Sequence, residues 1–149
     1  MSRRMALVLF ILGVVGVGWL IGSASAPGEW YQSLRKPEFN PPPWVFGPVW
    51  TVLYVMIGVA GWRAWLLPER GPLGVWAAQM ALNFAWTPTF FVAQAIGAAL
   101  VVILLLLAAI LAFIVLTWNR DRLAALLFVP YAAWVAFASL LNASIWTMN

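Results

Sequence analysis

Two long stretches of the chain carry no charged side chain. Residues 71–119 form a 49-residue window without Asp, Glu, Lys or Arg, and residues 123–149 form a second of 27 residues. A soluble domain must cover its surface with polar groups, whereas only 8% of these 149 residues are charged and 65% are hydrophobic. The windows therefore belong in lipid, and the sequence predicts an all-α integral membrane protein.

The length of the apolar stretches predicts five membrane crossings. A helix needs roughly 20 residues to cross about 30 Å of hydrocarbon. The longer window is too long for one span, so we expect it to turn at residues 94–97, where Gln94 and Gly97 interrupt the apolar run. The result is a single domain, residues 1–149, folded as a five-helix bundle. The expected spans are residues 5–24, 44–66, 73–93, 98–118 and 123–146.

The N-terminal segment has the pattern of a signal peptide, since Arg3 and Arg4 precede an apolar run that ends in Ala24-Ser25-Ala26. The run is about 18 residues long, more than a typical signal core. Pro27 would directly follow the cut and hinder the peptidase. We therefore expect this segment to be retained as the first span.

Positive charges are unequally divided between the two sides of such a bundle. With five spans, Arg35 and Lys36 lie on one side, and the other six positive side chains lie on the side of the N-terminus. Those six are Arg3, Arg4, Arg63, Arg70, Arg120 and Arg122. The asymmetry predicts a cytoplasmic N-terminus, with the first loop and the C-terminus outside. No continuous basic face exists, so a nucleic-acid partner is not expected.

The chain contains no His and no Cys. His-ligated metals, iron–sulfur clusters, disulfides and His-assisted nucleophilic catalysis are therefore excluded. We expect no metal site and no obligatory cofactor. Any reaction would have to depend on the ligand or on redox-capable side chains.

The first loop, residues 27–43, is the only sizeable one. Its segment from Lys36 to Pro43 contains four prolines, which remove backbone donors and favour extended geometry. Such a stiff segment suits a lid across the outer mouth of the bundle. A plain connector is the alternative, but 17 residues are far more than a connection needs.

Polar and aromatic side chains recur at helical spacing on three spans, where they must face inward because lipid offers no hydrogen-bond partner. The stripes are Trp76, Gln79, Asn83, Trp86 and Phe90; Pro130, Trp134, Ala138, Leu141, Asn142 and Ile145; and Trp50, Tyr54 (or Leu53) and Ile57. One interpretation is that the amides join helices and the indoles fill the core. The other, which we favour, is a pocket for a flat, mostly apolar ligand that stacks on indoles and is oriented by amides.

Further features have ordinary explanations. Trp30, Trp44, Trp62, Trp65, Trp118 and Trp146 lie near predicted span ends, as interfacial indoles do. Pro88 and Pro130 lie inside spans and are expected to kink them. Gly18 and Gly22 match G-x-x-x-G, which indicates close packing or dimerisation.

Three blocks of residues resemble the tryptophan-rich sensory protein family, whose animal members are the mitochondrial translocator proteins (peripheral benzodiazepine receptors). The likeness is to a bacterial-type member. The first-loop block is Trp30-Tyr31-x-x-Leu34-x-Lys36-Pro37, Pro41-Pro42 and Phe46-Gly47-Pro48-Val49-Trp50-x-x-Leu53-Tyr54. The others are Gln79-x-x-Leu82-Asn83-x-Ala85-Trp86-x-Pro88-x-Phe90-Phe91 and Pro130-Tyr131-x-x-Trp134-x-Ala136-Phe137-Ala138-x-x-Leu141-Asn142-x-x-Ile145-Trp146.

The resemblance implies a homodimer of five-helix bundles with a ligand cavity under the first loop. It implies protoporphyrin IX as ligand, together with isoquinoline carboxamide and benzodiazepine compounds. Positions that match the family's pocket are Trp50, Asn83, Trp86, Trp134, Ala138, Leu141 and Asn142, and the inward stripe adds Tyr54. Trp50 and Trp134 also match indoles implicated in light-dependent porphyrin breakdown in some bacterial members.

The resemblance has limits. Ala143 stands where sterol-binding relatives place a Tyr, and no basic residue follows Leu123, so sterol recognition there is not expected. Ala98 replaces a pocket Trp of some relatives and would leave one wall more open.

The expected function is a porphyrin receptor or sensor that regulates tetrapyrrole metabolism. A transporter of porphyrin, or of a sterol-like small molecule, is the alternative. Ion coupling is disfavoured because Arg63 is the only charged side chain within a span, whereas passive or exchange movement stays open. A structural anchor without a ligand is a third hypothesis, against which the Trp and amide stripes argue.

Overall fold

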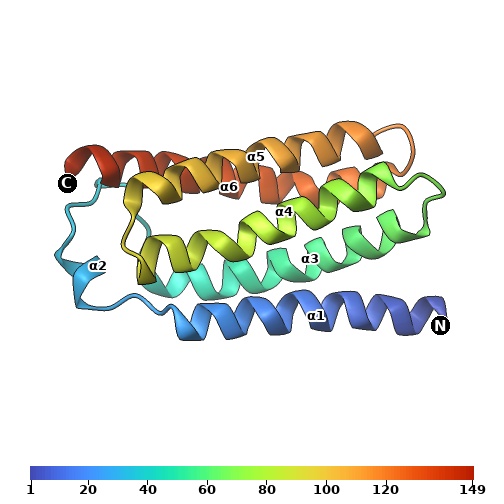
Figure 1. The fold of residues 1–149 in the computed structure, drawn as a ribbon, viewed down its shortest axis with the longest axis horizontal. Helices are drawn as coiled ribbons and strands as arrows, with labels where there is room; N and C mark the ends of the chain where they lie inside the picture. The colour runs from blue at the N-terminus through green and yellow to red at the C-terminus, as the bar shows by residue number, and fades with distance from the viewer.

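The structure, a computed structural model that describes residues 1–149, is entirely helical. Its long helices lie side by side with alternating direction (Figure 1). They are α1 (Arg3–Ala24), α3 (Phe46–Leu66), α4 (Gly71–Thr87), α5 (Ile96–Thr117) and α6 (Arg122–Met148). The predicted all-α fold is confirmed.

A sixth helix, α2 (Glu29–Ser33), forms in the first loop, where the sequence analysis expected none. Glu29 lies in its first turn, where a carboxylate interacts favourably with the helix dipole. The Pro-rich part behaves as expected, because residues 34–42 contain no helix and η1 (Pro43–Val45) leads directly into α3.

Four helical segments are long and apolar enough to cross a membrane: Arg3–Ala24, Pro43–Leu66, Ile96–Thr117 and Arg122–Met148. They correspond to four of the five predicted spans. The third predicted span, residues 73–93, is divided into α4, of 17 residues, and the π-helix η2 (Pro88–Val92). The widening starts at Pro88, whose ring lacks the N–H group and disturbs the preceding turn.

The predicted turn within the long neutral window lies at residues 93–95, directly before α5. Gln94 adopts a left-handed conformation, with φ of 54°. The backbone N–H groups of Ala93 and Ala95 donate to the carbonyls of Pro88 and Thr89 at 2.9 and 3.1 Å. These bonds satisfy the carbonyls of the first two residues of η2 and stabilise the turn into α5.

The apolar core lies between α3, α5 and α6. Its largest fully buried side chains include Tyr131, Phe113, Phe128, Ile57, Ile103 and Ile110. Helix α1 packs mainly on α3 and has only three buried residues, so most of its surface is left for lipid. Of the G-x-x-x-G pair, Gly18 packs on the ring of Tyr54 and Gly22 has open space around it, so only Gly18 serves close packing within the chain.

The charged residues belong to helix ends and to the connections between helices, and Figure 1 shows these connections at the two ends of the bundle. The N-terminus and the α3–α4 and α5–α6 connections share one end, which carries the six arginines expected there. Arg63 binds Asp121 through two hydrogen bonds of 2.8 and 3.0 Å, and Asp121 also caps α6. The exposed Arg120 pairs with Glu69 at 3.4 Å. Arg35 and Lys36 lie in the loop at the opposite end.

The backbones of α1 and α3 approach each other closely at Gly58, and this contact allows a stability test. A Cβ atom on Gly58 would lie 2.9 Å from Cα of Ile11, and backbone cannot move aside as a flexible side chain can. We expect Gly58→Ala to lower the free energy of unfolding by about 1–3 kcal/mol, measured by denaturant or thermal unfolding of the purified protein. Gly16→Ala is the control, because a Cβ there meets nothing within 4 Å. Equal stability of the two variants would contradict this packing.

Candidate functional site

The two tryptophans singled out for ligand stacking lie against each other. Trp50 of α3 and Trp134 of α6 meet edge to face, with ring centroids 6.4 Å apart and an interplanar angle of 88°. Phe46 and Phe137 extend this aromatic group, at 5.7 and 5.9 Å from the ring of Trp134. Trp50 also contacts Tyr54 at 5.4 Å.

The indole N–H of Trp134 is buried and has no hydrogen-bond partner. A donor without an acceptor in an apolar environment costs free energy, and most such donors in folded proteins are satisfied. The group is therefore available to an acceptor atom of a bound molecule.

A chain of hydrogen bonds joins three helices next to this aromatic group. The Tyr54 hydroxyl donates to Oδ1 of Asn83 at 3.3 Å, and Nδ2 of Asn83 donates to the Tyr131 hydroxyl at 2.7 Å. Tyr131 in turn donates to Oε1 of Gln79 at 2.8 Å. All four side chains are buried. Asn83 and Gln79 thus join helices, which was the alternative interpretation of the inward amides. A ligand-binding role for Asn83 stays a prediction.

A second polar link holds α4, α5 and α6 together. Trp86 donates its indole N–H to Oδ1 of Asn142 at 3.0 Å. The Asn142 amide donates to the carbonyl of Ile96, the first residue of α5, also at 3.0 Å. Ala138 and Leu141 are buried on the same face of α6.

The structure thus brings the eight predicted ligand-binding residues into the bundle interior, in its half nearest the first loop. Five of them are buried, and the three tryptophans are half-buried. They are Trp50 and Tyr54 of α3, Asn83 and Trp86 of α4, and Trp134, Ala138, Leu141 and Asn142 of α6.

The predicted inward position of one residue on α6 is wrong. Pro130 is exposed, whereas its neighbour Tyr131 is fully buried and connects Asn83 to Gln79. A hydroxyl three residues before Trp134 lies on the same helical face, so the spacing contained a signal for Tyr131. The prediction instead assigned that position to the proline.

The first loop packs on the end of the bundle through aromatic rings. Tyr31 of α2 contacts Phe90 and Phe91 at centroid distances of 6.2 and 5.3 Å. Further along the loop, Phe39 contacts Phe137 of α6 at 6.2 Å. Burial raises the pKa of the Tyr31 phenol above its usual value. Through Phe137, the loop is connected to the aromatic group around Trp134.

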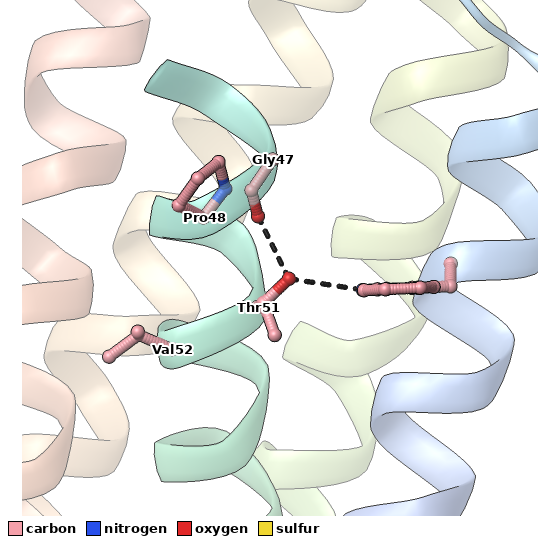
Figure 2. A pocket seen from close by; sticks show the side chains of 5 residues that line it. Gly47, Pro48, Thr51 and Val52 are labelled. Atoms are coloured by element: carbon pink, nitrogen blue, oxygen red, sulfur yellow. Dashed lines mark hydrogen bonds between the residues drawn. The ribbon is translucent and has the colours of Figure 1, made fainter. Parts of the chain in front are cut away.

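Two grooves lie on the outer faces beside α1. One, of about 570 Å³, is lined by Trp19 of α1 and by Gly47, Pro48, Thr51 and Val52 of α3. Figure 2 shows the bond of 2.8 Å from the Thr51 hydroxyl to the Gly47 carbonyl. The other groove, of about 390 Å³, lies between α1 and α4. Neither is lined by a predicted ligand-binding residue.

Four apolar helices are long enough to cross a bilayer, and indole and amide hydrogen bonds join α4 to them inside the bundle. These features define a multi-pass helical membrane protein. The model of the TspO/MBR family matches residues 6–147. The chain belongs to this family, as the resemblance of its sequence blocks predicted.

Individual relatives agree with this assignment. The chain is 42% identical to the translocator protein of Homo sapiens over 142 residues, covering 89% of this chain and 84% of that protein. It is 37% identical to the tryptophan-rich sensory protein of Cereibacter sphaeroides over 150 residues, covering 100% and 95%. It is 37% identical to the tryptophan-rich protein TspO of Archaeoglobus fulgidus over 148 residues, covering 96% of each chain.

The hydrogen-bond chain predicts unequal effects of two similar substitutions. Tyr131→Phe removes two short bonds and leaves Asn83 and Gln79 without this partner in the core, so we expect a loss of about 1–2 kcal/mol in unfolding free energy. Tyr54→Phe removes one bond of 3.3 Å and should cost less. Unfolding of the purified variants compares the two. A larger effect of Tyr54→Phe would contradict the central position of Tyr131.

Proposed function

We propose that this chain is a membrane receptor that binds protoporphyrin IX and related flat, apolar ligands against the aromatic group that contains Trp50 and Trp134, and thereby regulates tetrapyrrole metabolism. The observation that carries the proposal is the buried, unpaired N–H of Trp134 beside the face of a second indole. Stacking surfaces with one free donor suit a planar ligand that has few polar atoms. One relative is named a sensory protein, in agreement with a receptor. Isoquinoline carboxamide and benzodiazepine compounds share this flat, apolar chemistry.

The proposal includes a fifth crossing by α4 and η2. Together they extend over residues 71–92, which is roughly 33 Å at 1.5 Å per residue and enough for the hydrocarbon core. With five crossings, the end that carries six arginines is cytoplasmic, and the first loop and C-terminus lie outside. The family resemblance leads us to propose a homodimer as well.

The Pro-rich first loop acts as the lid in this proposal. Its Phe39 lies on Phe137, and Phe137 lies on Trp134, so movement of the loop would expose the proposed ligand position. Neither outer groove is lined by Trp50 or Trp134, which supports access from the loop end.

Fluorescence titration of the purified protein with protoporphyrin IX tests the proposal. We expect micromolar binding that quenches Trp emission, because the porphyrin accepts excitation from a stacked indole. Trp134→Phe should raise the Kd about three- to tenfold, as expected for loss of an aromatic contact and a hydrogen bond. Trp118→Phe is the matched control. Trp118 is 40% exposed at the opposite end of the bundle, where its ring lies under the Arg122 guanidinium. Equal effects of both variants would refute the assigned site.

A transporter is the alternative, and one relative is named a translocator protein. Arg63, the one charged side chain within a predicted span, is bound to Asp121 and is not free for ion coupling. Porphyrin flux into vesicles that contain the protein, compared with protein-free vesicles, distinguishes the two. Flux above the protein-free rate would establish transport in place of sensing.

Light-dependent porphyrin loss is a separate test of Trp50 and Trp134. Illuminated porphyrin sensitises oxygen, and the two indoles beside it are the most easily oxidised side chains in the site. We expect absorbance loss to require light and oxygen and to slow severalfold in Trp50→Phe or Trp134→Phe under saturating protein. Loss at the same rate in protein-free micelles, or in the dark, would show that the protein only holds the porphyrin.

A further inference from the structure

The side chain of Asn149 binds the backbone of the first loop. Its Oδ1 accepts a hydrogen bond from the N–H of Arg35 at 3.0 Å, and its Nδ2 donates to the carbonyl of the same residue at 2.9 Å. The side-chain amide therefore pairs with Arg35 in the way that a backbone peptide pairs with a neighbouring strand. Arg35 and Asn149 are 114 positions apart in the sequence.

Asn149 is held in place from its own helix. Its second N–H donates to the carbonyl of Ile145 at 2.7 Å, one turn back in α6. Both hydrogens of the amide group are thus in use, and the carbonyl oxygen accepts from Arg35. An amide fixed in this way loses little further freedom when it binds the loop.

These two bonds are the only hydrogen bonds that join the first loop to a part of the bundle distant in sequence. Apart from the bond from the Val45 N–H to the Pro42 carbonyl, where the loop joins η1, the other hydrogen bonds of residues 27–42 stay within the loop. The remaining loop contacts are between apolar side chains: Trp30 and Tyr31 lie on the rings of η2, Leu34 packs in the same cluster, and Phe39 lies on Phe137. Arg35 lies between Leu34 and Phe39 in the sequence, so Asn149 holds the backbone between these packed side chains.

We propose that Asn149 is a positioning residue that holds the first loop across the end of the bundle and so controls how fast a ligand reaches and leaves the interior. The control of ligand entry and exit, the gating part, rests on the proposed function. The attachment of the loop by Asn149, the holding part, does not. Figure 1 shows the C-terminal end of α6 at the same end of the molecule as α2 and the first loop. Loss of the Asn149 side chain should release the backbone at Arg35 and Lys36 while the packed side chains on either side keep the loop attached.

Trypsin cleavage at Arg35 tests the holding part without any ligand. A serine protease must place the carbonyl of the residue it cleaves after in its oxyanion hole. The Arg35 carbonyl is bound to Asn149, and Pro37 makes the next peptide, after Lys36, a poor substrate. We expect the Arg35–Lys36 bond to be cut about three- to tenfold faster in Asn149→Ala than in the unsubstituted protein, as loss of two exposed hydrogen bonds implies.

The assay is run on the full chain in detergent micelles and read by mass spectrometry. Cleavage after Arg70, at the opposite end, is the internal reference for protease activity and for general unfolding. Asn149→Asp keeps the shape of the side chain but removes both N–H donors, so it should also speed the cut. Thr147→Ala is the matched control, because Thr147 is exposed in the same turn and bonds only to Ser144 of its own helix. Equal Arg35 cleavage in all four proteins would overturn the proposal.

Stopped-flow mixing with protoporphyrin IX tests the gating part. If Asn149 controls access, the association and dissociation rate constants both rise in Asn149→Ala and Asn149→Asp, and the Kd changes less than either rate. Unchanged rate constants alongside faster trypsin cleavage would overturn gating but not holding. Failure of the unsubstituted protein to bind porphyrin would refute the proposed function and leave the trypsin result as the separate test of Asn149.

Discussion

A hydroxyl or amide group inside a bilayer must find its partner within the protein, because lipid offers no donor or acceptor. The chain from Tyr54 through Asn83 and Tyr131 to Gln79 meets this requirement by connecting α3, α4 and α6. Each bond fixes both the rotation of a helix and its height relative to its neighbour, since the donor and acceptor must lie about 3 Å apart. The positions of Trp50 and Trp134, one turn away from this chain, follow from it.

The same requirement separates the tryptophans by what they do. Trp86, Trp76 and Trp62 donate their indole N–H groups to Asn142, to the carbonyl of Ile57 and to the carbonyl of Arg3. These indoles join helices, and their donors are already used. Trp134 alone has a buried N–H without an acceptor. Spacing along the sequence places Trp86 and Trp134 on equivalent inward stripes, and only the hydrogen bonds show that their roles differ.

Much of the architecture could be predicted because the membrane makes the sequence pattern simple. Charge-free windows predicted the long helices. Because polar groups in lipid must face inward, the burial of residues such as Asn83 and Asn142 was predicted correctly. The partners of these amides could not be predicted, because partner choice depends on the relative heights of helices distant in sequence. The choice of Pro130 over Tyr131 failed for a related reason: a stripe with a period of about 3.6 admits either neighbour, and only packing decides between them.

The short helix α2 and the π-helix η2 were missed because each is a local departure from regular geometry. Five residues of helix give no periodic signal, and α2 is held by the contacts of Tyr31 with Phe90 and Phe91. Those two rings belong to η2, where the widened turn presents adjacent residues toward the loop. Pro88 was recognised as a source of distortion, but the sequence did not show that the distortion provides the loop's docking surface.

The two ends of the molecule are held by different forces, and this difference bears on where it can open. At the basic end, Arg63 and Asp121 form a two-bond ion pair that also caps α6, next to short connections between helices. At the other end, a long loop whose only helix is the five-residue α2 is held by apolar contacts and by one side-chain amide. Charge-assisted bonds with two points of contact are stronger and more directional than ring contacts. Opening at the loop end, as the proposed lid requires, therefore disrupts the bundle less than opening at the basic end.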